Sequence, residues 1–502
     1  MRPGTLLRLA LAGTRTDGAR VALTALSAAL ATLAGLAALT VLAVAKPPGD
    51  EWTQSEQYTT ALLREPGLRP GVAFALLLLC VPVLGLAGQC ARLGAPGRDR
   101  RLAALRLAGA TPGQVTRLAV AETGVASLLG TVSGLAVFEV GRRLLHRPDA
   151  AGRLPLPTDM HPAPAAVAAV VVGLPLVAAL VSALLLRRVT TTPFGVVRRV
   201  RTRAPWPWPG VLILVALASF AAIRPLLLWY ERRDAVEPDG LVPTLVVVGS
   251  LAAMIGVVSG TGWISYTVGR VLHRHGRGPA ALLAARRLTA DPWAGSRTFA
   301  ALLAALIFGA GAAAIRADFL ARIELSRIAD SGGMAGSDSF YLGAMDLVDL
   351  AVAVAVAIAA GGLLVAVVEG VTSRRRAYAA QVATGVPRST IGRSLLWASI
   401  APAAPAIALA LTVGYLLIRG TLPAPSGGDF ERVVCDTGPQ GCGTDGVATR
   451  TEWVPKVTVT PDVPWEQLAW FAAGGLAAVL VTVGAGLLLL RSATSVEELR
   501  AS

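Results

Sequence analysis

Residues that could carry out covalent or phosphate chemistry are scarce in this chain of 502 residues. Lysine occurs only at Lys46 and Lys456, and neither lies in the G-x-x-x-x-G-K-[ST] pattern that cradles nucleotide phosphates. The four histidines fall in two separated loop pairs, with no metal-ligand spacing or catalytic triad around them. We therefore expect no enzymatic activity, and no cofactor or metal bound by this chain.

Cysteine chemistry is expected at one place. Cys435 and Cys442 lie in a polar, glycine-rich loop at 419–465. A disulfide that closes this loop is the preferred interpretation if the loop is extracellular, and a two-cysteine metal site without histidine is the weaker one.

Acidic residues inside apolar segments are rare and point to function by default. Glu122 and Glu139 lie within the apolar run 117–141, and Arg142 and Arg143 follow Glu139 closely. We interpret Glu139 as a partner of these arginines at a membrane interface, and Glu122 as a residue that favours a helix start. A proton relay would need acids at mid-depth, so the pattern argues against proton-coupled transport.

The composition excludes a large soluble enzyme. Hydrophobic residues make up 54% of the chain and charged residues only 15%, with a mean hydropathy of +0.61, whereas soluble domains carry about 25% charged residues. The net charge is +15, and arginine supplies almost all of the positive charge. Because no basic block is interleaved with aromatic residues, we attribute this charge to cytoplasmic loops and expect no nucleic-acid partner.

Ten apolar stretches are long enough to cross a bilayer, which takes about 20 residues of helix. The first is longer than the core of a cleaved signal peptide, so we expect it to remain as a span. Alternate connecting segments hold 29 and 17 Lys and Arg residues, and the excess predicts that both termini are cytoplasmic. The abundance of Ala, Arg and Gly with almost no Lys suggests a GC-rich bacterial genome, so we expect a multi-pass protein of the bacterial plasma membrane. The stretches are 21–45, 71–92, 117–141, 163–186, 209–229, 243–268, 298–316, 347–369, 393–418 and 466–490.

The sequence contains an internal repeat. The basic segment at 98–117 matches that at 374–393 with an offset of 276 residues, which places Gly109 on Gly385 and Val115 on Ile391. Since each copy has four spans, both insert in the same orientation. The prediction is an all-α polytopic membrane protein of two parallel four-helix repeats, 1–200 and 276–502, joined by two linking helices within 201–275.

Each repeated segment predicts a short amphipathic helix, a glycine break and a new helix that enters the membrane. In the first copy the helix at 98–108 ends at Gly109, and Thr111-Pro112-Gly113-Gln114 forms a capping box. The second copy keeps Gly385 but lacks the box. One such helix could simply lie on lipid phosphates, but two at equivalent places favour a docking surface for a cytoplasmic partner.

The run Arg106 to Thr111, followed by an apolar span with an early Glu122, resembles the FtsX-like permease family, and 382–386 is a more degenerate match. The resemblance implies the membrane subunit of an ABC transporter of the MacB, Lol or bacitracin-export type. It also implies that the repeated loops contact a separate ATPase, in two copies, which holds the ATP and Mg²⁺. The residues implied in this contact are Leu105, Arg106, Gly109, Ala110, Thr111, Gln381, Val382, Gly385 and Val386.

The large extracellular domain of many family members is missing here, so the resemblance leaves the substrate open. We expect export or extraction of an amphiphilic or antimicrobial substrate, with membrane lipid and an outer-face protein as further partners. The alternatives are an ion- or proton-coupled secondary transporter without an ATPase and, more weakly, a regulatory membrane scaffold. Pro402 and Pro405 should kink the ninth span and let loop motion tilt its distal half.

Overall fold

We analysed a computed structural model of the chain. It describes residues 15–45, 55–66, 68–80, 83, 86–87, 104, 107–190, 206–233, 238, 240–328, 338–428, 430–435 and 449–493.

The described residues are almost entirely helical, as the composition predicts. The helices are α2 (Arg15–Ala43), α3 (Ala61–Arg64), α4 (Arg69–Leu78), α7 (Pro112–Leu144), α8 (Pro164–Thr190), α9 (Trp208–Glu231), α10 (Leu241–His275), α11 (Pro279–Ala290), α12 (Trp293–Ile328), α13 (Asp338–Ser373), α14 (Arg375–Ala383), α15 (Arg388–Arg419) and α16 (Trp465–Ala493). Four short strands, β1 (Ser426–Gly427), β2 (Phe430–Cys435), β3 (Thr449–Val454) and β4 (Val457–Thr458), complete the elements.

Eight helices within the described residues are long and apolar enough to cross a membrane, namely α2, α7, α9, α10, α12, α13, α15 and α16. The other two expected spans coincide with α4 and with α8, whose segment Pro164–Leu180 is a shorter apolar helix. The expected total of ten therefore remains a prediction, while the multi-pass character is clear.

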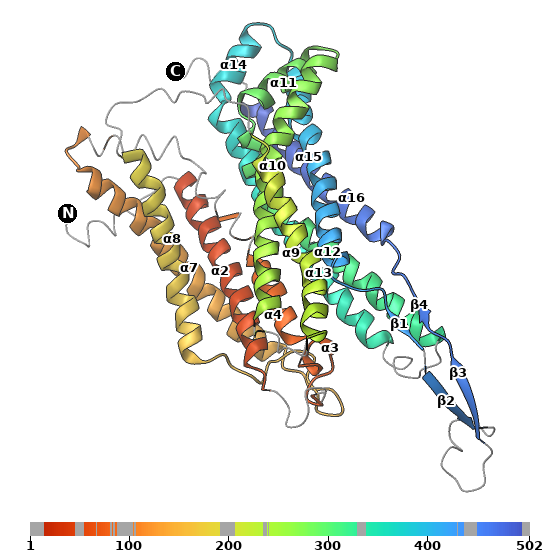
Figure 1. Ribbon diagram of the computed structural model, residues 1–502. Helices are drawn as coiled ribbons and strands as arrows, with labels where there is room; N and C mark the ends of the chain where they lie inside the picture. The colour runs from red at the N-terminus through yellow and green to blue at the C-terminus, as the bar shows by residue number, and fades with distance from the viewer. Residues whose placement is uncertain are drawn as a thin grey trace.

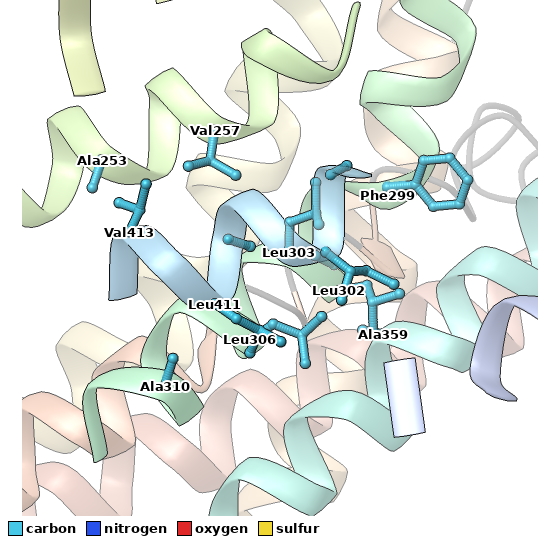
Figure 2. Packing of buried hydrophobic residues seen from close by; sticks show 14 of the residues in the cluster. Ala253, Val257, Phe299, Leu302, Leu303, Leu306, Ala310, Ala359, Leu411 and Val413 are labelled. Carbon is cyan, nitrogen blue, oxygen red and sulfur yellow. The ribbon is translucent and has the colours of Figure 1, made fainter. Parts of the chain in front are cut away.

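The helices form two groups, with α9 and α10 between them in Figure 1. The first group is α2, α4, α7 and α8, and the second is α12, α13, α15 and α16. The linking helices α9 and α10 pack on α15, and α10 also packs on α12. The largest buried cluster joins α10, α12, α13 and α15 through Val257, Leu306, Ala359 and Val413, as Figure 2 shows.

Helices α7 and α15 have matching bounds and corresponding neighbours in the two groups. Helix α7 begins at Pro112 and α15 begins 276 residues later at Arg388. In the first group α7 packs on α2 and α8, and in the second group α15 packs on α12 and α16. The helix pairing thus follows the repeat seen in the sequence.

Small residues allow these helices to approach closely. A Cβ added to Gly134 would lie 2.8 Å from the carbonyl oxygen of Ala29 on α2, and one added to Gly256 would lie 2.9 Å from the side chain of Ile213 on α9. Gly134 and Gly256 belong to the sequences Gly130-x-x-x-Gly134 and Gly256-x-x-x-Gly260, and helix packing is the role of both.

We name the two ends of the bundle by what they carry. The arginine-rich end, uppermost in Figure 1, holds α11, α14 and the starts of α7 and α15. The hairpin end holds α3 and a projecting hairpin in which β2 pairs antiparallel with β3, from Phe430↔Val454 to Cys435↔Thr449.

The sequence of Val454–Val459 suggests a small hairpin within that run, but the structure differs. The run holds only the end of β3 and all of β4, and β4 pairs with β1. The last residue of β2 is Cys435, whereas Cys442 lies outside the described residues. The disulfide between them remains a prediction.

Candidate functional site at the arginine-rich end

The first repeated segment changes direction at Gly109, which adopts a positive φ of 90°. The backbone N–H of Thr111 donates to Gln114 Oε1 at 3.1 Å, and the N–H of Gln114 donates to Thr111 Oγ1 at 3.4 Å. This is the predicted capping box, and it fixes the start of α7. Ala110 lies half-buried between the two features, and Leu105 and Arg106 lie outside the described residues.

The second repeated segment has the same turn, stabilised by backbone bonds. The N–H of Val386 donates to the carbonyl of Gln381, and the N–H of Gly385 donates to the carbonyl of Val382, both at 3.0 Å. With Gly385 at a φ of 90°, this is a Schellman motif that ends α14. Pro387 starts α15 without a side-chain cap, as the sequence predicts.

Helix α14 is packed onto the bundle by its apolar side chains. Tyr378 and Ile391 are buried in one cluster, and Val382 and Val386 pack against it together with Leu487 of α16. Val382 and Val386 therefore position α14. Among the side chains of α14 and its end that the structure describes, Ala377, Ala380, Ala383 and Thr384 face solvent.

Helix α11 is a neighbour of α14 that sequence reasoning did not assign to the site. It packs on α10 and α15 and lies beside α14 in Figure 1. Its Arg287 donates from Nη1 to the hydroxyl of Tyr378 at 2.7 Å, across 91 residues of sequence. Leu282 and Leu283, which match Leu6 and Leu7 at the repeat offset, leave 40% and 37% of their surface exposed beside this contact.

Removing the hydroxyl of this contact should loosen the pair of helices. We expect Tyr378→Phe to lower stability by about 1–2 kcal/mol, because a charge-assisted hydrogen bond is lost at a half-buried arginine. Hydrogen exchange should become faster in α11 and α14. Tyr415→Phe, in the largest buried cluster, is the control. Equal hydrogen exchange of α11 and α14 in the two variants would show that the bond between Arg287 and Tyr378 does not hold these helices together.

Two long helices connect the site to the hairpin end. Helix α7 has 33 residues and α15 has 32, so each extends about 48–50 Å at 1.5 Å per residue. Pro402 and Pro405 both lie inside α15. A displacement at Gly109 or Gly385 thus acts on one end of a long helix, α7 or α15, that spans the bundle.

A buried ion pair holds α7 to its neighbour α2. Arg20 of α2 contacts the carboxylate of Glu122 on α7, and their side chains are only 7% and 10% exposed. Glu122 therefore does more than favour a helix start. The expected pair at the other end of α7 is confirmed, with Arg142 Nη2 at 3.3 Å from Glu139 Oε2.

Helix α15 cannot supply the acidic partner of such an ion pair. Its sequence contains no aspartate or glutamate between Arg388 and Arg419. The position that Glu122 occupies on α7 therefore has no acidic equivalent on α15.

Comparison with known proteins gives a family match for part of this arrangement. Residues 72–194, which include Gly109 and all of α7 and α8, match the model described as FtsX-like permease C-terminal. No curated protein and no solved structure matches the chain significantly. The chain is thus a multi-pass membrane protein in which residues 72–194 match the FtsX-like permease C-terminal family.

Proposed function

We propose that this chain is the permease subunit of an ABC transporter in the bacterial plasma membrane, with its arginine-rich end in the cytoplasm. The observation that carries the proposal is the pair of glycine turns at Gly109 and Gly385, each followed by a helix that crosses the bundle. One turn lies inside the matched permease domain. An ATPase that moves these turns would move α7 and α15 as levers.

The repeated turns support two ATPase contacts on one chain. The matching bounds of α7 and α15, and their matching neighbours, favour two parallel repeats of four spans. Such a chain would hold two ATPase copies, with ATP and Mg²⁺ bound by the ATPase. The substrate of this system is proposed to be an amphiphile that is exported or extracted at the hairpin end.

The alternative of an ion-coupled transporter finds little support among the described residues. Glu122 pairs with Arg20, and Arg316 Nη1 on α12 lies 2.9 Å from both Asp346 and Asp349 on α13. Acids held by arginines are poorly suited to exchange protons or ions.

The test is co-purification of the tagged chain with the ATPase encoded beside its gene. We expect a complex of about two ATPases per chain, and its loss in a variant with Leu107→Asp and Ala380→Asp. Leu107 is 92% exposed just before Gly109, and Ala380 is exposed on α14, so neither change disturbs packing.

A matched control is Leu144→Asp, an exposed leucine at the hairpin end of α7. This variant should retain the complex. Failure of the unmodified chain to bind the ATPase would refute the proposal, and ion- or proton-dependent uptake would then be measured.

A further inference from the structure

A cavity of about 560 Å³ lies between the two helix groups at the hairpin half of the bundle. Leu33, Ala37 and Phe138 line it from α2 and α7, and Phe308 and Ala351 line it from α12 and α13. Because each group supplies only part of the wall, the volume depends on how the groups sit relative to each other.

The wall is apolar except near one end. Most lining side chains are aliphatic, and the hydroxyl of Thr40 donates to the carbonyl of Leu36 at 2.7 Å. The charged group on the wall is Arg142, at the hairpin end of α7. Its Nη1 donates to the carbonyl of Thr158 at 2.9 Å and its Nη2 lies 3.3 Å from Glu139, while its buried Nε has no hydrogen-bond partner among the described residues.

The hairpin end of the cavity is covered by a cap, which we define as residues 55–64 and 154–160. Tyr58 in the cap is fully buried, and its hydroxyl donates to Asp159 Oδ1 at 3.1 Å. Burial and the adjacent carboxylate raise the pKa of Tyr58 well above its usual range, so the hydroxyl stays protonated as a donor. Leu63 and Leu156 of the cap line the cavity.

The cap is held to the membrane helices by Arg69. Its guanidinium donates to the carbonyl of Leu63 at 2.8 Å and to those of Val44 and Ala45, at the end of α2, at 3.2 and 2.9 Å. The folded cap thus forms the wall of the cavity at its hairpin end.

We propose that this cavity binds one long acyl chain of an amphiphile, with an anionic head group beside Arg142. The volume lies in the range of about 300–1,000 Å³ that holds one small ligand, which suits one chain. An almost wholly aliphatic wall recognises a hydrocarbon, and the guanidinium of Arg142 on that wall supplies a positive charge that attracts an anion.

Only the consequence of acyl-chain binding, and not the binding itself, rests on the proposed function. If ATP-driven motion of α7 and α15 moves the two groups against each other, it changes the cavity and expels the chain. Binding itself requires no ATPase and can be measured on this chain alone.

The experiment measures binding of radiolabelled palmitate and of a palmitoyl lysophospholipid to the purified full chain in detergent. Ala351→Trp fills the cavity from α13, and Ala304→Trp fills it from α12. We expect each change to weaken binding of both probes at least tenfold. Ala353→Trp, two residues along α13 at an exposed position, is the matched control and should bind as the unmodified chain does.

The head-group assignment has its own variant. Arg142→Met should weaken both anionic probes and leave a neutral palmitoyl glycerol unaffected. If only palmitate binds, the head group is a carboxylate, and if only the lysophospholipid binds, it is a phosphate. Either result supports the assignment. Equal loss for the neutral probe would overturn it.

The outcomes separate the cavity from the proposed function. Undiminished binding in Ala351→Trp and Ala304→Trp, or equal loss in Ala353→Trp, would overturn the cavity even if the ATPase complex forms. Binding with the expected variant pattern in a chain that recruits no ATPase would leave the cavity standing and refute only the transporter assignment.

Discussion

Replacing Gly109 or Gly385 by alanine is expected to uncouple the chain from its ATPase while leaving the membrane bundle folded. Both glycines have a φ of 90°, and an added Cβ would meet no atom within 4 Å at either position. The cost of alanine is therefore the backbone conformation itself, about 1–2 kcal/mol at each site. Relief of that strain would change the angle between the short helix before each glycine and the long helix, α7 or α15, that follows it.

The measurement is ATPase stimulation by the reconstituted permease together with the midpoint of thermal unfolding. We expect stimulation to fall several-fold in each single variant and further in the double variant. Gly→Asn at the same positions should be milder, because asparagine tolerates a left-handed conformation better than other residues with a side chain.

Gly113→Ala is the matched control for this prediction. Gly113 also has open space where a Cβ would lie, but it belongs to the first turn of α7 and has no positive φ. Alanine there should raise stability slightly, by about 0.4–1 kcal/mol. If Gly109→Ala and Gly113→Ala behaved alike, the left-handed turn would not be the coupling element.

The second large effect is expected at the buried ion pair. Removing one partner, as in Glu122→Leu or Arg20→Met, should lower stability by about 3–5 kcal/mol because it strands a buried charge. The double variant Arg20→Met with Glu122→Leu should recover most of this loss, since two apolar side chains of similar size can replace a buried pair.

A double-mutant cycle on thermal unfolding measures this coupling. The exposed i,i+4 pair of Asp149 and Arg153 near the hairpin end is the control, because exposed pairs contribute only about 0–1 kcal/mol. Additive losses at Arg20 and Glu122 would show that the two side chains do not act as a pair. The ATPase stimulation of the stable double variant would then report whether fastening α7 to α2 matters for coupling.

Some features of this protein follow from the sequence because they depend on residues close together in the chain. The capping box of Thr111 and Gln114 and the helix breaks at Gly109 and Gly385 are confirmed as predicted, since each is decided within a few residues. The long helices follow from apolar runs, because a bilayer leaves a chain no other way to satisfy its backbone. The Glu139 and Arg142 pair follows from their i,i+3 spacing.

Other features were decided only by tertiary structure, because they join segments distant in sequence. No local pattern pairs Arg20 with Glu122 or Arg287 with Tyr378, and no composition shows that two helix groups leave a cavity between them. Tertiary structure also decided that Val382 faces the bundle and not solvent, since α14 has to pack on α13, α15 and α16 before one of its faces is buried. The sequence determined which segments are helices and where they break, and packing determined which of their side chains meet.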